Sequence, residues 1–242
     1  MTTTGAKGTL YGVGVGPGAP DLLTLRAVEV LGRVRAILAA ASPNNDHSMA
    51  LEVARPHLKA GIEIVRLDFP MTRDRERLET AWRLAAQKAL EVLESLGDAA
   101  FLTLGDPLIY STFGYLMRRI EETAPGTPIE IVPGITSFQA AAARVPMILC
   151  EGEESLRILS GIGGEEALLG ELEGDATAVV LKAYRNCPAI LKALERSGRR
   201  GTAVMASRVE QPGETLAPCA DMDGSTPPYM TLILSPGTRE RS

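Results

Sequence analysis

Residues 9–32 read TLYGVGVGPGAPDLLTLRAVEVLG and join an apolar segment, a glycine- and proline-rich loop and an amphipathic segment. Residues 9–15 are apolar and β-prone, and the breakers in residues 16–20 end the strand that they predict. Asp21 or Thr24 is expected to cap the following helix, because short oxygen-bearing side chains accept from its first N–H groups. One face of this helix carries apolar side chains at helical spacing, namely Leu25, Val28 and Leu31. The stretch therefore predicts a β-strand, a loop and an α-helix in succession.

The alternation of strand and helix continues through the first half of the chain. Further strands are expected at residues 34–40, 62–67 and 99–104, and helices at residues 48–59 and 74–96. Trp82 lies on the apolar stripe of the last helix, so we expect it in the core. Repeated strand–helix units predict a parallel sheet covered by helices.

The pattern changes after residues 121–128, EETAPGTP, where charge, two prolines and a glycine predict a domain boundary. Strands are then expected near residues 129–132, 157–160, 177–182, 201–206 and 229–234, with helices near 136–144, 165–173 and 187–197. We therefore expect an α/β fold of two domains. Residues 1–124 form an N-terminal domain with a parallel sheet, and residues 125–242 form a C-terminal domain with a mixed sheet.

Charge and hydropathy exclude several classes of protein. The 242 residues include 25 Lys and Arg against 30 Asp and Glu, which gives a net charge of −5. Nucleic acids and anionic membranes both require a positive field, so neither is an expected partner. No apolar run approaches the roughly 18–20 residues that span a bilayer, and the N-terminus lacks the features of a signal peptide. We expect a cytoplasmic protein.

Cysteine and histidine usage predicts no metal site. Cys150, Cys187 and Cys219 are odd in number and widely spaced, which indicates reduced thiols rather than a disulfide framework or a zinc site. His47 and His57 are the only histidines and lie ten residues apart, so a histidine-based metal centre is not expected.

Loops rich in glycine and proline accompany several expected strands, at residues 14–20, 104–110, 133–137 and 227–229. The carboxyl ends of parallel strands share one edge of a sheet, so loops in these places can form one ligand site. In the second loop Asp106 lies between Gly105 and Pro107, and the proline restricts the backbone of the aspartate. The carbonyl groups of such a turn attract a cationic ligand. An ordinary turn whose aspartate caps a helix is the alternative.

Residues 14–19, GVGPGA, also match the dinucleotide fingerprint G-x-G-x-x-A. Pro17 and Pro20 remove two N–H donors that a pyrophosphate would need, and residues 34–40 lack the acidic residue that would bind a ribose. The sequence thus disfavours a nicotinamide-dependent dehydrogenase, which stays an alternative together with a ligand-binding module without catalysis.

Three segments carry a resemblance: YGVGVGPGAPDLLTLRA at residues 11–27, GDPLIYSTFGYL at 105–116 and VPGITSF at 132–138. They resemble the signature segments of the tetrapyrrole (cobalamin/sirohaem) methylases, and the resemblance covers nearly the whole chain in order and spacing. GDPLIYSTFGYL, LDFPMTRD and SMALEVA are most similar to one branch of the family. That branch methylates C20 of precorrin-2, or of cobalt-factor II in the anaerobic route, in cobalamin synthesis.

The resemblance implies a class III methyltransferase fold, in which two α/β domains have the active site in the trough between them, and a homodimer. The methyl donor would be S-adenosyl-L-methionine, which leaves as S-adenosyl-L-homocysteine, and the acceptor would be a small-molecule tetrapyrrole. A family member that methylates another ring carbon, or a diphthine synthase-like enzyme, is the alternative.

The resemblance also implies the site residues. Those expected to bind the donor are Pro17, Leu104, Gly105, Asp106, Ile109, Thr136, Ser137, Ala183, Arg208 and Thr231. The acceptor carries carboxylates and requires local cations and polar groups; its expected contacts are Ser111, Thr112, Lys182, Arg185 and Tyr229. Arg118 and Arg119 are expected on a solvated helix face.

The expected reaction needs neither a metal nor a covalent nucleophile, because the sulfonium methyl group is itself activated and alignment with the attacking carbon supplies most of the acceleration. Asp106 and Tyr110 are the candidates for removing the proton from C20. Their alternative roles are structural: Asp106 would fix its loop through hydrogen bonds, and Tyr110 would form a wall of the site. The proton can also leave directly to water.

Overall fold

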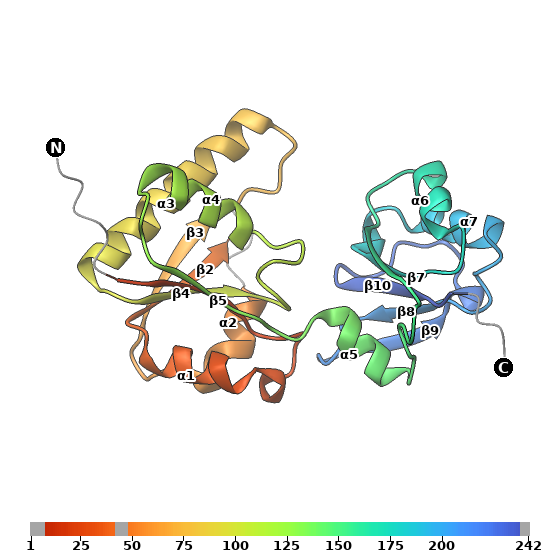
Figure 1. The fold of residues 1–242 in the computed structure, drawn as a ribbon, viewed down its shortest axis with the longest axis horizontal. Coiled ribbons are helices and arrows are strands. Elements are labelled where there is room, and N and C mark those ends of the chain that lie inside the picture. The colour runs from red at the N-terminus through yellow and green to blue at the C-terminus, as the bar shows by residue number, and fades with distance from the viewer. Residues whose placement is uncertain (1–7, 42–47, 238–242) are drawn as a thin grey trace. The chain divides into compact units, whose positions relative to one another are not determined.

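The computed structural model describes residues 8–41 and 48–237. The chain divides into two compact units, Met1–Thr136 and Ser137–Ser242, each with its own sheet and helices (Figure 1). His47 lies outside the described residues.

The first unit is built on a parallel sheet of five strands in the order β3-β2-β4-β1-β5. The strands are β1 (Leu10–Gly14), β2 (Ala36–Ala41), β3 (Glu63–Asp68), β4 (Ala99–Thr103) and β5 (Ile129–Val132). All residues of β1 and β4 are buried, as expected for central strands covered on both faces. The predicted parallel sheet is confirmed.

Helices cover both faces of this sheet (Figure 1). On one face α1 (Leu25–Arg33) and α2 (Met49–Ala54) pack in one apolar cluster. On the other face α3 (Arg75–Ser95) and α4 (Phe113–Thr123) pack in a second cluster. Thr24, rather than Asp21, caps α1 by accepting from Ala27 N at 3.1 Å. Trp82 is half-buried at the margin of the second cluster, where its ring stacks on Tyr115.

The second unit contains a mixed sheet in the order β6-β7-β10-β8-β9. Its strands are β6 (Leu156–Ser160), β7 (Thr177–Leu181), β8 (Val204–Ser207), β9 (Thr215–Pro218) and β10 (Thr231–Ser235). Only the pair of β6 and β7 is parallel. α5 (Ser137–Arg144) packs in the cluster on one face, and α6 (Glu165–Leu172) and α7 (Cys187–Arg196) pack in the cluster on the other.

The predicted boundary after residue 124 is wrong. Residues 121–123 end α4 and residues 124–128 connect it to β5, which pairs with β1, so this segment lies inside the first unit. A turn rich in proline and glycine has the same composition whether it joins two elements or two domains, which explains the error. The division falls between Thr136 and Ser137.

Two other local predictions differ from the structure. The expected helix over residues 48–59 is α2 followed by a short 3₁₀ helix, η2 (Arg55–His57), because Pro56 has no N–H for a continuing α-helix. No bounds were predicted for α4, although Arg118 and Arg119 were expected on a helix, and β9 was not predicted at all. β9 has only four residues, lies at the edge of the sheet and ends in Pro218, so no alternating or long apolar run marks it.

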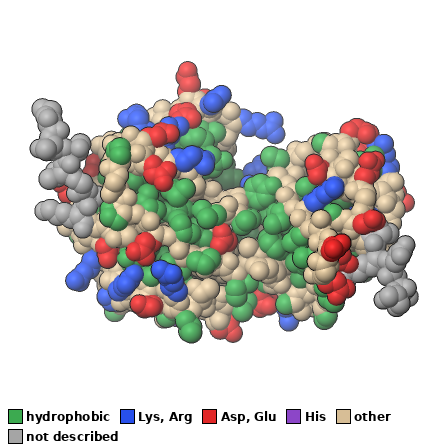
Figure 2. Space-filling view, viewed as in Figure 1, with side chains coloured by type: hydrophobic (Ala, Val, Ile, Leu, Met, Phe, Trp, Pro, Cys, Tyr) green, Lys and Arg blue, Asp and Glu red, His purple; other side chains and the backbone are tan. Residues whose placement is uncertain are grey.

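No helix among residues 8–41 and 48–237 is long and apolar enough to cross a membrane. On the face drawn in Figure 2, Lys and Arg side chains are interspersed with Asp and Glu, so neither sign dominates that face.

An ion pair ties α5 to the hairpin of β8 and β9. The guanidinium of Arg144 donates from Nε to Glu214 Oε1 at 2.8 Å, and the backbone N–H of Glu210 donates to Glu214 Oε2 at 2.8 Å. The hydrogen bond from Arg144, followed by that from the Glu210 backbone, lowers the pKa of Glu214. A carboxyl group with a lowered folded-state pKa stabilises the fold above its unfolded pKa, and this stabilisation is lost as the pH falls.

We therefore expect Glu214→Gln to be less stable than the wild type at pH 7, with the difference disappearing in acid. Urea unfolding at pH 7 and near pH 3 measures this. Glu153→Gln is the matched control, because Glu153 is exposed in the same unit and has no hydrogen-bond or ion-pair partner among the described residues. An equal loss of stability for Glu214→Gln at both pH values would contradict the assigned interaction.

Candidate active site

Three glycines from different loops meet at the carboxyl end of the first sheet. Gly14 ends β1, Gly105 follows β4 and Gly134 follows β5. A Cβ on Gly14 would lie 2.5 Å from Gly105 O and 2.6 Å from Gly134 N. A Cβ on Gly134 would collide with Gly105 O and lie 2.8 Å from the Gly14 backbone. We call these three residues the glycine junction. Gly14 and Gly134 must lack a Cβ for the backbones to approach this closely, whereas a Cβ on Gly105 would meet no atom closer than 4.0 Å.

Hydrogen bonds fix the loop after β1 to the loop after β4. Gly105 N donates to Gly16 O at 2.7 Å, and Val15 N donates to Thr103 O at 2.9 Å. Gly16 and Gly105 have φ values of 77° and 73°, in the left-handed region that favours glycine. Pro17 follows Gly16 and is buried. The two loops therefore form one continuous backbone surface at the edge where α/β sheets bind ligands.

The Asp106 carboxylate joins the loop after β4 to the loop after β5. Its Oδ1 accepts from Leu108 N at 2.8 Å, and its Oδ2 accepts from Gly134 N at 3.2 Å. Each carboxylate oxygen is thus engaged by a backbone N–H group. This geometry corresponds to the structural role considered for Asp106, in which the side chain holds two loops in register.

Three exposed apolar side chains follow the Asp106 turn. Leu108, Ile109 and Tyr110 expose 58%, 37% and 51% of their surface, and Tyr110 has a positive φ of 48°. Exposed apolar residues in succession are unusual beside a buried turn and are typical of a ligand-binding surface. Leu104, by contrast, packs partly buried against the apolar cluster of α1 and α2.

The hydroxyl of Ser111 fixes the start of α4. Its Oγ accepts from Phe113 N at 3.0 Å and lies 3.2 Å from Thr103 Oγ1. Thr112 is the N-cap residue of α4 and makes no side-chain capping bond. Of the two expected acceptor contacts in this loop, Ser111 therefore has a structural role, whereas the hydroxyl of Thr112 is not used in capping.

In the second unit the remaining expected donor contacts lie near the ends of strands. Ala183 is fully buried in η3 (Ala183–Arg185), directly after β7. Arg208 follows β8 with a φ of 50°, and its N–H donates to Met230 O at 2.9 Å. Thr231 begins β10, and its Oγ1 lies 2.7 Å from Pro228 O and 3.0 Å from Ser207 Oγ.

The expected acceptor contacts of the second unit lie at the same edge of its sheet. Lys182 has a φ of 57° and is the N-cap residue of η3, and Arg185 is the last residue of η3. The guanidinium of Arg185 lies 5.0 Å from the ring centre of Tyr184, and the rings of Tyr184 and Tyr229 are 4.9 Å apart. The site residues therefore form two groups, one in each unit. Thr136 is the last residue of the first unit and Ser137 the first of the second.

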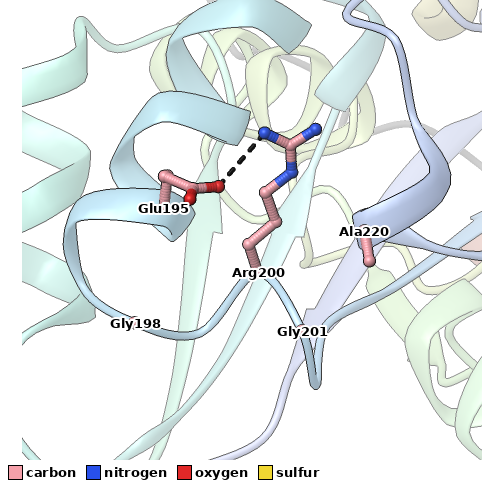
Figure 3. A pocket seen from close by; sticks show the side chains of 5 residues that line it. All are labelled: Glu195, Gly198, Arg200, Gly201 and Ala220. Atoms are coloured by element: carbon pink, nitrogen blue, oxygen red, sulfur yellow. Dashed lines mark hydrogen bonds and ion pairs between the residues drawn. The ribbon is translucent and has the colours of Figure 1, made fainter.

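A polar depression of about 490 Å³ in the second unit contains none of the expected residues. Figure 3 shows its lining, which comprises Glu195, Gly198, Arg200, Gly201 and Ala220. The Arg200 guanidinium is engaged by Glu195 at 3.1 Å and by Met222 O at 2.8 Å. These bonds join the end of α7 to the segment after β9. The polar groups that line the depression therefore serve to hold these two segments together. Its lining offers neither a free cation nor an apolar wall to a ligand.

The titratable groups of the described chain do not gather into a metal centre. Within residues 8–41 and 48–237 no three His, Cys, Asp or Glu side chains lie close enough to hold a metal ion. Cys187 and Cys219 are buried, and burial raises the pKa of the Cys219 thiol to about 12. Such a thiol stays protonated and unreactive at neutral pH.

Sequence reasoning missed two features of the site. Gly134 is the partner of Asp106 and part of the glycine junction; it was signalled only as a member of the loop at residues 133–137 and of the segment VPGITSF, with no role of its own. Tyr184 holds Arg185 and Tyr229, and its only signal was its position between two cations in LKAYRN. The contacts of Asp106 with Gly134 and of Tyr184 with Tyr229 join loops that are distant along the chain, so they do not follow from local sequence.

A comparison against known families identifies the family of the chain. The model of the tetrapyrrole (corrin/porphyrin) methylases matches residues 9–219. The chain therefore belongs to the tetrapyrrole methylase family.

Individual relatives are similar over most of the chain. The cobalt-precorrin-2 C(20)-methyltransferase of Salmonella typhimurium strain LT2 is 35% identical over 210 residues, which cover 86% of each chain. The precorrin-2 C(20)-methyltransferase of a Sinorhizobium species is 31% identical over 244 residues, or 97% of each chain. The cobalamin biosynthesis protein CobIJ of Mycobacterium tuberculosis strain H37Rv is 34% identical over 245 residues, or 98% of this chain. The chain spans about half of that protein, 47% of its length.

A solved structure supports the fold. The uroporphyrin-III C-methyltransferase of Thermus thermophilus, determined with S-adenosylhomocysteine, superposes with a TM-score of 0.65 at 24% identity. The superposition covers 94% of this chain and 97% of the other. Two α/β units in this order are thus the fold of the family.

Proposed function

We propose that the protein transfers a methyl group from S-adenosyl-L-methionine to C20 of precorrin-2 or cobalt-factor II in cobalamin synthesis. The names of the Salmonella and Sinorhizobium relatives support this acceptor, as does the resemblance of GDPLIYSTFGYL to that branch of the family. The observation that carries the proposal is the glycine junction, held by Asp106 and followed by three exposed apolar side chains.

The residues of the first unit fit a sulfonium donor. The glycine junction packs the backbones of three loops directly against one another, which fixes the positions of the loops after β1, β4 and β5 in which the expected donor contacts lie. In the proposal Pro17, Leu104, Gly105 and Ile109 contact the donor, and carbonyl oxygens near the sulfonium stabilise its positive charge. Thr136, Ser137, Ala183, Arg208 and Thr231 supply the remaining donor contacts.

The proposed chemistry requires alignment more than acid–base catalysis. The donor supplies an activated methyl group, and the electron-rich meso carbon attacks it in line with the departing sulfur. Asp106 has both carboxylate oxygens engaged by backbone N–H groups, so we assign it the positioning of the loops. Tyr110, half exposed beside this turn, is the remaining candidate for removing the proton from C20, and direct loss of the proton to water is the alternative.

Ligand binding tests the donor class. A ligand that binds only the native state stabilises it by about 2.7 kcal/mol at a concentration of 100 times its Kd. We therefore expect S-adenosylhomocysteine to raise the melting temperature by several degrees and NAD to leave it unchanged. A shift with NAD and none with S-adenosylhomocysteine would overturn the proposal and restore the dehydrogenase alternative.

The proposal includes a homodimer in the cytoplasm, which the family resemblance supports. Light scattering of the purified protein is expected to give twice the monomer mass of 25.7 kDa. A monomeric mass at micromolar concentration would contradict this part of the proposal and leave the activity to be tested separately.

A further inference from the structure

The loop between β8 and β9, residues 208–214, presents Arg208 at the edge of the second sheet where β10 begins. We call it the β8–β9 loop. β8 and β10 are antiparallel, and Ser207 at the end of β8 lies opposite Thr231 at the start of β10. Arg208 is exposed, and its guanidinium has no hydrogen-bond or ion-pair partner within residues 8–41 and 48–237. The loop therefore leaves the side chain of a proposed donor contact available to a ligand.

The backbone of the β8–β9 loop adopts a conformation that is unusual for residues with a side chain. Arg208, Glu210 and Gly213 have φ values of 50°, 60° and 81°, all in the left-handed region. For arginine and glutamate this region is unfavourable, and it persists only where the surrounding structure imposes it. The position of Arg208 therefore depends on contacts that hold the loop.

Glu214 supplies such contacts. Its Oε2 accepts from the backbone N–H of Glu210 at 2.8 Å, and its own N–H donates to Gln211 O at 3.0 Å. Its Oε1 accepts from Arg144 Nε at 2.8 Å, which joins the loop to α5. The Glu214 side chain is only 17% exposed, so solvent ions screen these bonds less than those of an open surface pair. The carboxylate thus ties a left-handed residue of the loop to a helix.

Arg208 is coupled to Glu214 through the turns of the same loop. Gln211 N donates to Arg208 O at 3.0 Å, and Gln211 O accepts from Glu214 N. A Cβ on Gly213 would lie 3.4 Å from Arg208 Nη1 and 3.9 Å from Arg208 Cδ, so the arginine side chain passes over the residue next to Glu214. A displacement of Glu214 therefore reaches both the backbone and the side chain of Arg208.

The β8–β9 loop has a second anchor in Val209. This side chain is 4% exposed and packs in the apolar cluster that contains α5. Apolar contacts are not directional, so this anchor holds the loop against the sheet without setting the φ angles of Arg208 and Glu210 on either side. Hydrogen bonds are directional, and those of Glu214 supply what the apolar anchor lacks.

We propose that Glu214, held by Arg144, is a positioning residue for the methyl donor. It fixes the β8–β9 loop so that Arg208 reaches the bound donor, and it acts through Arg208 without touching the donor itself. This inference rests on the proposed function, in which Arg208 contacts the donor. It deepens that function by naming residues outside the site that set the affinity for the donor.

A double-mutant cycle tests the inference by calorimetric titration of the whole protein with S-adenosylhomocysteine at pH 7. Arg208→Ala and Glu214→Ala are each expected to raise the Kd about tenfold, the size of one charge-assisted contact. Because Glu214 acts through Arg208, the double variant should also bind about tenfold more weakly than the wild type. Independent effects would instead multiply to about a hundredfold. Circular dichroism at the temperature of the titration establishes that each variant is folded.

Glu214→Gln tests the bond to Glu210 by a conservative change. The amide oxygen of glutamine still accepts from Glu210 N, whereas its amide nitrogen cannot accept from Arg144. The Kd for S-adenosylhomocysteine should therefore fall between that of the wild type and that of Glu214→Ala. A Kd for Glu214→Gln equal to that of Glu214→Ala would contradict the role given to the Glu210 bond.

Glu195→Ala is the matched control, because it removes another bond between glutamate and arginine from the same unit. Glu195 Oε2 accepts from Arg200 Nη1 at 3.1 Å, and Arg200 precedes β8, whereas the β8–β9 loop follows it. Binding of S-adenosylhomocysteine should be unaffected by this change. An equal loss in Glu195→Ala would overturn the inference, since weakened packing of the unit would then explain the effect.

The remaining outcomes separate the inference from the proposed function. Wild-type affinity in Glu214→Ala or in Arg208→Ala, or a hundredfold loss in the double variant, would overturn the inference and leave the proposed function standing. If the wild type itself does not bind S-adenosylhomocysteine, the proposed function fails, and the inference fails with it.

Discussion

Asp106→Ala is expected to reduce methyl transfer about a hundredfold while leaving the protein folded. The substitution frees the backbone N–H groups of Leu108 and Gly134, which the carboxylate now joins. The loops after β4 and β5 then lose their common anchor. A displacement of reacting groups by about 1 Å is enough to cost roughly 10²-fold in rate. Single-turnover kinetics with the acceptor, together with the melting temperature, measures both effects.

Asp106→Asn separates positioning from proton transfer. The amide oxygen of asparagine accepts from one of the two N–H groups, so we expect an activity between those of the wild type and Asp106→Ala. The affinity for S-adenosylhomocysteine should fall in the same order, and the pH profile of the rate should keep its shape. If asparagine is as damaging as alanine, and the acid limb of the profile disappears, Asp106 is the base. Normal methyl transfer by Asp106→Ala would remove the residue from the mechanism altogether.

Gly134→Ala is expected to have the largest effect on the fold of the site. The new Cβ would collide with Gly105 O and lie 2.8 Å from the Gly14 backbone, and neither neighbour is a flexible side chain. Overpacking of this kind costs about 1–3 kcal/mol, or a fall of roughly 2–12 °C in melting temperature. The three loops must separate to relieve the contact, so binding of S-adenosylhomocysteine should be lost as well.

Gly32→Ala provides the matched control for this variant. Gly32 lies in α1, and a Cβ there would meet no atom within 4 Å. Alanine in a helix is favoured over glycine by about 0.5–1 kcal/mol, so this variant should be slightly more stable and bind the donor normally. Calorimetric unfolding and titration of both variants compare them directly. Unchanged donor binding by a folded Gly134→Ala would show that the glycine junction does not shape the donor site.

The central part of the first sheet could be predicted from sequence because β1, β2 and β4 are short, mostly buried apolar runs bounded by turn-forming residues. Residues 9–15 alone indicated β1, and the parallel arrangement followed from the helices between strands. The boundary between the units was predicted too early because the turn at residues 121–128 looks like a linker. Only pairing of β5 with β1 assigns that segment to the first unit, and pairing between strands over a hundred residues apart leaves no local signal.

The loops of the candidate site could be predicted from sequence, but the contacts between them could not. Glycines and prolines at strand ends marked the loops, and the resemblance supplied the residues within them. The engagement of Asp106 by Gly134, and of Arg185 by Tyr184, depends on side-chain direction in three dimensions. Ser111 was expected to contact the acceptor because it lies in a signature segment. In the structure its hydroxyl instead accepts from Phe113 N and fixes the start of α4.

Transfer of an isotopically labelled methyl group tests the central claim most directly. The purified protein is incubated with S-adenosyl-L-methionine labelled in its methyl carbon, with precorrin-2 and cobalt-factor II offered separately. We expect one labelled methyl group on one of the two acceptors, found by mass spectrometry and located at C20 by NMR. A label on another ring carbon, or no transfer to either acceptor while S-adenosylhomocysteine still binds, would contradict the assignment to C20.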